Sequence, residues 1–410
     1  MVHPGFLKAI CEEPDDDAHR LIYADWLDDH GDPDRAEFIR LQCALARLDD
    51  EDEAMQAREA ELLRRHGDAW RDELPDLPKV VWQDPFRRGF VKSASVPNYT
   101  AWQKQGLALL AAAPLEWVSL YQMTPRTVRL LARSPGIERV RGLEFPDANF
   151  GDSDLEVLGE SCRLRVFRFH GRGQGASNLG HDAGRILGTS PGFRRLRQLH
   201  LVATPLHNGV ATDLTSAPNF VELEEFRLIS CGLTAISFDS LLAHVSWNRL
   251  RLLDVSANNI RDEGVRKIAS CPGMTNLREL WMTHCQVGDA GVTAIARSMF
   301  LTNLRLLELG YGEFGADGLH ALMTSSNLRT LRSLTFFSYN ITGADIVALL
   351  RSPLGANLRE LNVCGRPIDA ESAAAIVVLP GLENLTRLFV SEGEADDLLR
   401  RRFGDRITIL

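Results

Sequence analysis

The chain has 410 residues, of which 45% are apolar and 25% charged, and its formal net charge is −9. This composition is ordinary for a globular protein and excludes a collagen-like, mucin-like or wholly disordered chain. No segment approaches the roughly 18 consecutive apolar residues that a membrane-spanning helix needs, and residues 1–20 lack the apolar core of a secretory signal. Seven scattered cysteines form no C-x-x-C pair. We therefore expect a cytoplasmic protein with reduced thiols.

The negative charge is concentrated near the N-terminus. Residues 1–78 hold 22 acidic and 9 basic side chains, a net of −13, whereas residues 79–410 hold 33 and 37, a net of +4. Such an asymmetry indicates a domain boundary and suggests different partners for the two parts.

Residues 1–78 show helical periodicity. Apolar side chains recur on one face over 6–10, 21–27 and 38–48, with a break at Gly31, Asp32 and Pro33. A fourth helix is expected over Glu53 to His66. We therefore predict a small all-α domain over 1–78, followed by a linker or N-terminal cap of the next domain over 79–114.

The second of these helices carries a candidate site for metal binding or catalysis, made of Tyr23, Asp25, Trp26, Asp28, Asp29 and His30. Asp25 and Asp29 are four residues apart and would share a helix face, so together with His30 they could bind a metal or act as acid and base. The alternative, which we favour, is an exposed helix face that ends at Gly31, with Tyr23 and Trp26 packing. Its acids could also pair with the arginines at positions 20, 35 and 40. We accordingly expect no catalytic residue, no metal ligand and no cofactor.

A long repeat dominates the rest of the chain. The pattern L-x-x-L-x-L, with conservative apolar changes, begins at Leu164, Leu196, Leu223, Leu250, Leu277, Leu304, Leu331, Leu358 and Leu385. The first interval is 32 residues and the other seven are 27 residues. A fixed period of this length is the signature of a solenoid, in which each unit buries its apolar face against the next.

The unit that starts at Leu250 shows the expected structure. Leu253 and Val255 alternate along one face of a short strand. Asn258, eight positions after the first leucine (position +8), can satisfy backbone groups in the turn, and apolar residues at helical spacing follow. Each unit is thus a strand, a turn and a helix.

Weaker copies extend the array back to about residue 115. We predict an α/β solenoid of about eleven units over 115–410, shaped as a horseshoe with parallel strands on the concave face and helices on the convex face. The five extra residues of the first interval fall within 170–182. They predict a loop insertion rather than a phosphate-binding loop, since no P-loop lysine follows the glycines.

Two resemblances follow from these motifs. The helix-bearing 27-residue unit resembles the ribonuclease-inhibitor class of leucine-rich repeats. RLIYADWLDDHGDPDRAEFIRLQ (20–42) closely resembles the repeat-companion domain of bacterial leucine-rich-repeat proteins, and FRRGFVKSASV (86–96), AAAPLEWVSL (111–120) and RRRFGDRITIL (400–410) are similar to the linker and ending of that family. The resemblance covers nearly the whole chain. It implies a fold and carries no activity with it.

The concave face is the most informative surface for function. Positions +2, +4 and +6 alternate with the leucines and should face this side, with +7 near its rim. Basic and histidine side chains lie in its first half and aromatic rings in its second. The residues that we predict as partner contacts are Arg168, His170, His200, Arg227, Asp254, Trp281, His284, Glu308, Tyr311, Phe337, Asn362 and Phe389. Exposed rings beside arginine are typical of interface hot spots; the alternative is that the rings pack on one another across neighbouring strands.

Position +1 carries a second pattern, an arginine ladder made of Arg165, Arg197, Arg251, Arg278, Arg305, Arg332 and Arg359. Such a ladder could bind nucleic acid or dock the acidic N-terminal domain, although a net of +4 is far from a nucleic-acid footprint. Cys231 and Cys285 occupy position +8, where we expect them to be buried core residues, and Cys364 at +6 is expected on the concave face.

These patterns favour a non-enzymatic scaffold that binds an unidentified partner protein through the concave face. Two alternatives are a regulatory or catalytic subunit that uses the N-terminal acidic and histidine cluster, and a nucleic-acid-binding protein that uses the arginine ladder. The sequence indicates no membrane partner and no small-molecule substrate.

Overall fold

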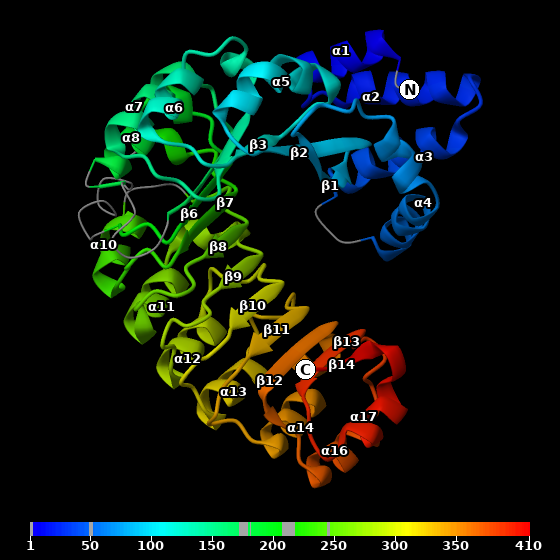
Figure 1. Ribbon diagram of the computed structural model, residues 1–410. Coiled ribbons are helices and arrows are strands. Elements are labelled where there is room, and N and C mark those ends of the chain that lie inside the picture. The colour runs from blue at the N-terminus through cyan, green and yellow to red at the C-terminus, as the bar shows by residue number, and fades with distance from the viewer. Residues whose placement is uncertain (1–2, 49–51, 172–178, 181, 207–217, 244–246) are drawn as a thin grey trace. The chain divides into compact units, whose positions relative to one another are not determined.

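The computed structural model describes all residues except 1–2, 49–51, 172–178, 181, 207–217 and 244–246 (Figure 1). The chain forms two compact units, Met1–Phe169 and His170–Leu410. None of the described helices is long and apolar enough to cross a membrane. Most of the loop insertion predicted within 170–182 lies outside the described residues.

Four helices open the first unit: α1 (Pro4–Glu12), α2 (Asp17–Asp29), α3 (Pro33–Leu45) and α4 (Glu53–Asp72). Three of them begin after an aspartate, Asp16, Asp32 or Asp52, whose carboxylate accepts a backbone N–H of the first turn. Such a contact satisfies an amide that has no partner within the helix. The predicted all-α start is confirmed. However, α4 extends past the predicted end at His66, and its last turns bury Trp70.

A hairpin and three short repeats complete the first unit. β1 (Val81–Arg87) pairs antiparallel with β2 (Phe90–Val96), and the turn between them has positive φ at Arg88 and Gly89. β2 then pairs in parallel with β3 (Trp117–Leu120), β3 with β4 (Gly142–Phe145), and β4 with β5 (Val166–His170). The helices between these strands are α5 (Tyr99–Ala112), α6 (Pro125–Leu131) and α7 (Asp152–Ser161), with a 3-10 turn η1 at Ile137–Arg139.

Two apolar clusters join the helices to the hairpin. Phe38 of α3 contacts Trp70 of α4, with ring centroids 4.7 Å apart, and Phe86 of β1, 5.8 Å apart. Phe90 of β2 packs in the second cluster with Ile39 of α3. The segment predicted as a linker or cap therefore contributes core residues to the helical region.

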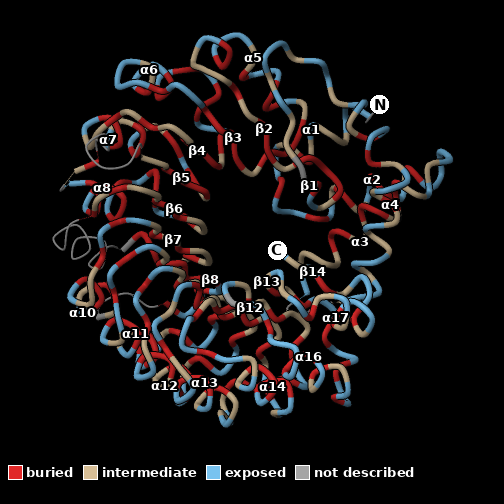
Figure 2. The backbone as a smooth tube through the Cα atoms, turned by 60° about the horizontal axis from the view of Figure 1, so that its bottom comes forward, coloured by how far each residue is buried: buried red, intermediate tan, exposed pale blue. Residues whose placement is uncertain are grey.

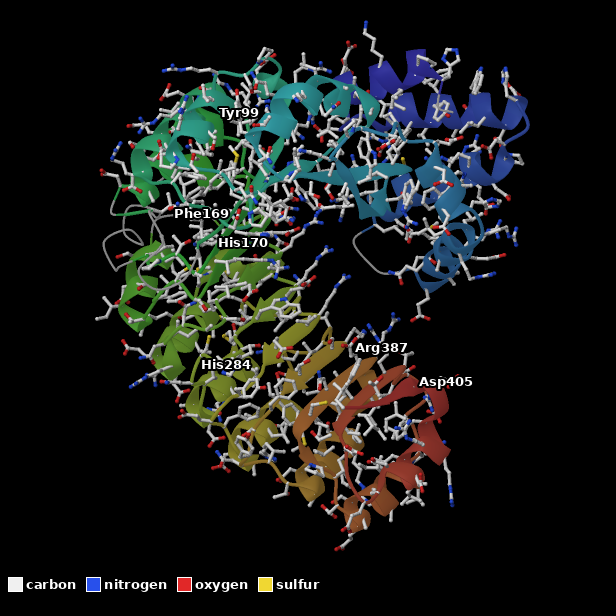
Figure 3. The ribbon with its side chains drawn as sticks, viewed as in Figure 1. Tyr99, Phe169, His170, His284, Arg387 and Asp405 are labelled. Atoms are coloured by element: carbon white, nitrogen blue, oxygen red, sulfur yellow. The ribbon has the colours of Figure 1, made fainter. Side chains whose placement is uncertain are left out.

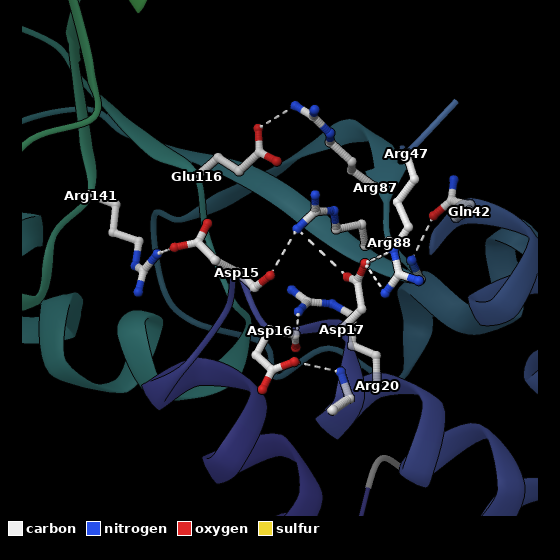
Figure 4. Close-up of polar contacts among 12 residues, drawn as sticks. Asp15, Asp16, Asp17, Arg20, Gln42, Arg47, Arg87, Arg88, Glu116 and Arg141 are labelled. Atoms are coloured by element: carbon white, nitrogen blue, oxygen red, sulfur yellow. Dashed lines mark hydrogen bonds and ion pairs between the residues drawn. The ribbon is translucent and has the colours of Figure 1, made fainter. Parts of the chain in front are cut away.

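An ion-pair network holds the turn between α1 and α2 against the strands (Figure 4). Asp15 pairs with Arg141, which precedes β4, and with Arg165, which precedes β5. The Asp17 carboxylate is buried and lies 3.0 Å from Arg47 Nη2 and 3.6 Å from Arg88 Nη1. Arg165 is the first member of the predicted arginine ladder. The acidic helical region thus docks on arginines of the first repeats within this unit.

The second unit alternates strands with helices. Its strands are β6 (Gln198–Val202), β7 (Glu225–Ile229), β8 (Leu252–Asp254), β9 (Glu279–Trp281), β10 (Leu306–Leu309), β11 (Ser333–Phe336), β12 (Glu360–Pro367), β13 (Arg387–Ser391) and β14 (Ile407–Ile409). Neighbouring strands pair in parallel and in chain order. The register follows the repeat, because Leu280 pairs with Leu307 and Leu307 with Leu334.

The helices of this unit lie along the outer side of its strands (Figure 1). They are α8 (Ala183–Thr189), α10 (Ala235–Ala243), α11 (Arg261–Ala269), α12 (Asp289–Arg297), α13 (Ala316–Met323), α14 (Gly343–Arg351), α15 (Pro353–Asn357), α16 (Ala370–Val377) and α17 (Asp396–Phe403). The described residues of this unit also form the 3-10 turns η2 (Pro191–Phe193), η3 (Pro218–Phe220), η4 (Pro272–Asn276) and η5 (Gly404–Arg406).

Burial follows the leucine pattern. Leu277, Leu280 and Met282 at positions 0, +3 and +5 of one repeat are buried between sheet and helices, and buried positions recur along the strands in Figure 2. Glu279 and Trp281, which alternate with them, are half-buried on the opposite face. The predicted α/β solenoid, with strands on the inner side and helices on the outer side, is confirmed.

Position +8 joins consecutive repeats through buried polar contacts. Asn258 Oδ1 accepts the backbone N–H groups of Cys231 and Leu233, each at 3.0 Å, and its Nδ2 donates to the Leu228 carbonyl at 2.6 Å. The Sγ of Cys231 donates to the Leu201 carbonyl at 3.2 Å. The side chain at +8 therefore reaches the carbonyl at +5 of the preceding repeat and satisfies buried backbone groups, as predicted.

The helices are linked in the same repeating way. The Asp262 Oδ1 accepts the Gly288 N–H at 2.7 Å, and the Asp289 Oδ1 accepts the N–H groups of Gly315 and Gly318 at 2.9 and 2.7 Å. A β-carbon at Gly318 would stand 2.8 Å from that carboxylate oxygen. Glycine is therefore needed there for the two helices to approach.

Candidate functional site

The turns that follow β6 to β10 have an unusual backbone at position +7. In five consecutive repeats φ lies between 50° and 57°, at Ala203, Ser230, Ala257, His284 and Tyr311. The left-handed conformation costs a non-glycine residue about 1–2 kcal/mol. Alanine, serine, histidine and tyrosine all occur at this position. The backbone of the turn therefore sets the direction of the side chain but does not restrict which residue stands there.

Three predicted contact residues meet at this turn in adjacent repeats. His284 follows β9 (Figure 3), Tyr311 follows β10 and Phe337 follows β11. The rings of His284 and Tyr311 stack with centroids 4.0 Å apart and planes 10° apart, and Tyr311 meets Phe337 edge to face at 5.3 Å and 72°. We call these three residues and Tyr339 the aromatic cluster.

The aromatic cluster borders a pocket of about 150 Å³, lined by Tyr311, Phe337, Ser338, Tyr339, Cys364 and Gly365. Tyr311 is 50% exposed and Tyr339 is 75% exposed, while Phe337 is half-buried. The Ser338 hydroxyl donates to the Phe314 carbonyl at 2.6 Å, so it serves the fold rather than the pocket. Rings therefore supply most of the surface that a ligand would touch.

A partly buried carboxylate lies beside the aromatic cluster. Glu308 Oε1 accepts the Thr283 hydroxyl at 3.1 Å and the Gly310 N–H at 3.2 Å. Burial raises the pKa of the Glu308 carboxyl; hydrogen bonds, first from Thr335, act against this rise. Among the described residues, no lysine, arginine or histidine forms an ion pair with Glu308.

Gly310 lets this carboxylate approach the cluster. A β-carbon at Gly310 would stand 2.8 Å from Glu308 Oε1 and 3.2 Å from Phe337 Cδ2. The Glu308 carboxylate and the Phe337 ring therefore both lie next to the space that a side chain at position 310 would fill.

Two other predicted contacts already pair with each other. Arg227 Nη1 lies 3.1 Å from Asp254 Oδ2, and the Arg227 guanidinium lies 5.9 Å from the centre of the Trp281 ring. Asp254 is buried and Trp281 is half-buried, with its indole N–H donating to Glu279 at 3.2 Å. This part of the face is thus largely neutralised by its own side chains.

The remaining predicted contacts are less available than expected. His200 is buried, with Nε2 3.4 Å from Glu225 Oε2, because the neighbouring strand covers it. Asn362 accepts the Cys364 N–H at 3.2 Å, and Phe389 is half-buried. In the first unit, Arg168 lies over the Trp117 ring at 4.0 Å. His170, labelled in Figure 3, is half-buried.

Exposure of the aromatic residues is also lower than predicted. Of Trp281, Tyr311, Phe337 and Phe389, only Tyr311 is exposed. The alternative of rings packed across neighbouring strands accounts for part of this result, since Tyr311 contacts Phe337 directly.

Sequence analysis missed Tyr339 and the pocket. A signal was available, because position +8 is Thr204, Cys231, Asn258 and Cys285 in earlier repeats and then becomes Gly312 and Tyr339. A tyrosine cannot replace a small buried hydrogen-bonding side chain at this position, so it must point elsewhere.

The predicted acidic and histidine cluster of α2 makes its contacts with other residues of the first unit. Arg40 Nη2 lies 2.6 Å from both Asp25 Oδ1 and Asp28 Oδ2, and the His30 ring nitrogen lies 2.7 Å from the Trp26 carbonyl. Burial raises the pKa of Tyr23 to about 12. Of the three arginines considered for these acids, Arg40 pairs with them, whereas Arg20 and Arg35 are buried and donate to the carbonyls of Asp16 and Gly89.

A different trio, Glu13, Asp16 and His19, places three possible ligand atoms within 4.8 Å of one another. Its members already have structural contacts, because Asp16 accepts the Ala18 N–H at 2.8 Å and His19 lies 3.3 Å from Glu13.

The arginine ladder supports the sheet through its backbone. The Arg278 carbonyl accepts the N–H groups of Arg305 and Leu306 at 2.7 and 2.9 Å, and the Arg305 carbonyl accepts those of Arg332 and Ser333. Arg197 lies 3.9 Å from Glu224, and Arg165 pairs with Asp15. Acidic side chains therefore partly neutralise the positive charge of the ladder.

The cysteines at position +8 are buried, as predicted. Burial raises the pKa of Cys231 and Cys285 to about 12. Their thiols donate to backbone carbonyls at 3.2 Å. Such thiols serve the fold and are poor nucleophiles.

Comparison with known proteins identifies the repeats. Residues 246–269 and 273–296 match the model of a family described as Leucine Rich repeat. No curated protein matches the chain. A solved chain from the yeast Rad7 and Elc1 complex is 15% identical with a TM-score of 0.50, over 93% of this chain and 87% of that one.

Two bacterial structures are also similar. A Bacteroides fragilis protein is 14% identical with a TM-score of 0.37, over 62% of this chain and 67% of that one. An internalin from Listeria monocytogenes is 14% identical with a TM-score of 0.34, over 70% and 93%. The repeats matched by the family model are thus leucine-rich repeats, and the fold is an α/β leucine-rich-repeat solenoid.

Proposed function

We propose that this protein is a non-enzymatic scaffold that binds a partner protein through the inner face of its second unit, with the aromatic cluster as the anchor. The observation that carries this proposal is the exposure of Tyr311 and Tyr339 beside the pocket. Tyrosine supplies a large apolar area at low entropic cost and is enriched at interface hot spots.

Other features support a protein partner. A solenoid offers an extended inner surface for binding. The similar yeast chain occurs in a complex with a second protein. On this proposal the partner also touches Trp281, Asn362 and Phe389, which are half-buried on the same face.

Three further assignments belong to the proposal. Residues 1–78 form a repeat-companion domain, joined through 79–114 to the solenoid over 115–410. The protein acts in the cytoplasm, in keeping with its seven free cysteines. The repeats are of the ribonuclease-inhibitor class, in keeping with a helix after most strands.

The test is affinity capture with a variant that removes the anchor and spares the fold. Tyr311→Gly deletes the ring at a position with φ of 56°, which glycine adopts without strain. We expect the variant to fold normally and to lose the proteins that the wild type captures from a lysate of the source organism.

Ala257→Gly is the matched control, because it makes the same backbone change at the same repeat position with φ of 57°. We expect it to capture the same proteins as the wild type. An identical set of captured proteins for Tyr311→Gly and the wild type would disprove the role of the aromatic cluster.

A further inference from the structure

Two carboxylates and an imidazole converge where the turn after α1 meets the first turn of α2. Glu13, Asp16 and His19 each offer one ligand atom, and these three atoms lie within 4.8 Å of one another. We call these residues the carboxylate–histidine trio. The trio belongs to the first unit and shares no residue with the acidic and histidine cluster of α2, whose acids pair with Arg40.

Neighbouring contacts fix the backbone that carries the trio. Pro14 is buried, and the Asp16 N–H donates to the Glu13 carbonyl at 3.0 Å. The acids on either side of Asp16, which are Asp15 and Asp17, are each paired with two arginines. The side chains of the trio therefore extend from a turn that is held on both sides, and such support favours a metal site.

The donor atoms of the trio are accessible to an ion. The side chains of Glu13 and His19 are 68% and 33% exposed, and Asp16 is exposed as well. One carboxylate oxygen of Asp16, Oδ1, accepts the Ala18 N–H at 2.8 Å, which leaves the second oxygen for an ion. The Glu13 carboxylate lies against the third member of the trio, with Oε2 3.3 Å from His19 Nε2.

Other converging acids of this unit hold an arginine between them. Arg58 lies 2.6 Å from Glu37 and 2.8 Å from Glu61, and Arg40 joins two acids of α2 in the same way. The two acids of the trio converge on an imidazole, and no lysine or arginine in the described part of the chain forms an ion pair with either of them. A neutral imidazole can bind a metal ion, whereas a guanidinium only donates hydrogen bonds.

We propose that the carboxylate–histidine trio binds one divalent transition-metal ion, with zinc as the ion that suits its donors best. Zinc takes carboxylate oxygens at about 2.0–2.2 Å and imidazole nitrogens at about 2.0–2.1 Å, so donor atoms around a tetrahedral ion lie roughly 3.4 Å apart. The distance of 3.3 Å between His19 Nε2 and Glu13 Oε2 matches this spacing. The exposed Asp16 carboxylate needs to approach by no more than about 1.5 Å.

The ion joins the end of α1 to the start of α2, because Glu13 follows the first helix and His19 lies in the second. Three protein ligands leave the fourth position of a tetrahedral ion to water. The imidazole favours zinc over magnesium and calcium, which prefer oxygen ligands. Nε2 must bind without its hydrogen, so the ring carries its hydrogen on Nδ1, and protons compete with the metal.

The test is calorimetric titration of the full chain, without an affinity tag, with zinc chloride. We expect the wild type to bind one ion per chain. Glu13→Gln, Asp16→Asn and His19→Gln should each weaken zinc binding at least about tenfold, because each removes one ligand. Asparagine caps a helix as well as aspartate does, so Asp16→Asn preserves the start of α2.

Two variants control for nearby charge and for other histidines. Glu12→Gln removes the adjacent acid, which lies 3.9 Å from Lys8. His66→Gln removes another imidazole beside a carboxylate, since His66 Nε2 lies 2.7 Å from Asp34 Oδ2. Both variants should bind zinc as tightly as the wild type does. Magnesium in large excess should not displace the zinc, and binding should be weaker at about pH 5.5 than at about pH 7.5.

Hydrogen exchange gives a second measurement. Zinc should slow the exchange of amides at the start of α2 in the wild type and leave it unchanged in His19→Gln. The absence of saturable zinc binding by the wild type would overturn the proposal. Binding that survives both Asp16→Asn and His19→Gln, or that needs several ions per chain, would indicate an adventitious ion only. Neither result bears on partner binding by the aromatic cluster, which belongs to the second unit.

Discussion

At the scale of single residues, the candidate site depends on a carboxylate that the neighbouring repeats partly bury. Burial raises the pKa of Glu308 above the value near 4.5 of an unfolded chain. The folded chain therefore binds this proton more tightly than the unfolded chain does. The group favours folding below about pH 4.5, and this contribution is lost as the pH rises through the raised pKa. At neutral pH the ionised Glu308 thus weakens the fold.

Glu308→Gln should consequently raise the free energy of unfolding at neutral pH, by no more than about 1 kcal/mol because solvent screens a part-exposed carboxylate. The amide oxygen can still accept the hydrogen bonds from Thr283 and Gly310. The gain should shrink towards zero below about pH 4.5, where both side chains are neutral. Urea unfolding followed by circular dichroism at the two pH values checks this.

The exposed Glu313 provides the control. Glu313→Gln should leave the urea midpoint unchanged at both pH values. A Glu308→Gln variant that is less stable than the wild type at neutral pH would contradict the argument.

Alternation along the strand was sufficient to predict that Glu308 lies on the inner face. Its hydrogen bonds were not predictable, because the repeat places Thr283 and Thr335 on the two neighbouring strands but does not determine which way each hydroxyl turns. The stacking of His284 on Tyr311 depends likewise on a left-handed turn, which residues other than glycine adopt only uncommonly.

At the scale of elements, α2 is held at its two ends by acids of unequal burial, Asp17 and Asp28. The side chain of Asp17 is 4% exposed and pairs with Arg47 and Arg88. The side chain of Asp28 is 41% exposed and pairs with Arg40. Loss of a buried charge leaves its partners without compensation, whereas solvent replaces an exposed pair at little cost.

Asp17→Asn should lower the local stability of α2 by about 1–3 kcal/mol, and Asp28→Asn should lower it by less than about 1 kcal/mol. Hydrogen exchange of peptides from α2, followed by mass spectrometry, measures the opening free energy of this element directly. Equal acceleration of exchange in the two variants would show that the buried pairs of Asp17 do not hold α2 more firmly than the exposed pair of Asp28.

The prediction of helices and strands succeeded where a sequence period recurs. It failed where a single tertiary contact determines whether an element forms or where it ends. The 27-residue spacing predicted the strands of the second unit and their common register. The hairpin of β1 and β2 has no period, and its turn rests on positive φ at Arg88 and Gly89. Similarly, α4 continues beyond His66 because Trp70 packs on Phe38, a contact from another helix.

At the scale of the whole chain, the uneven charge has a structural consequence. Asp15 belongs to the acidic region over 1–78, whereas Arg141 and Arg165 belong to the array predicted from 115 onwards. They pair inside one compact unit. The acidic region therefore partly neutralises Arg165, the first member of the arginine ladder. The predicted division at 78 and 114 stays a prediction.

The seven cysteines give a test that spans both units. Cys43, Cys162, Cys231, Cys271 and Cys285 are buried, and only Cys11 and Cys364 are partly accessible. Burial raises the pKa of Cys11 to about 11 and also raises that of Cys364. Because the thiolate is the reactive form, both thiols should react slowly near neutral pH.

We expect iodoacetamide to modify only Cys11 and Cys364 in the native protein, at rates that rise with pH, for Cys11 about tenfold per pH unit between neutral pH and about pH 10. All seven cysteines should react in denaturant, at similar rates. Peptide mass spectrometry after timed quenching distinguishes the sites. Native-state modification of Cys231 or Cys285 would contradict the prediction, because those thiols donate to the carbonyls that join consecutive repeats, and their exposure would require the solenoid to open.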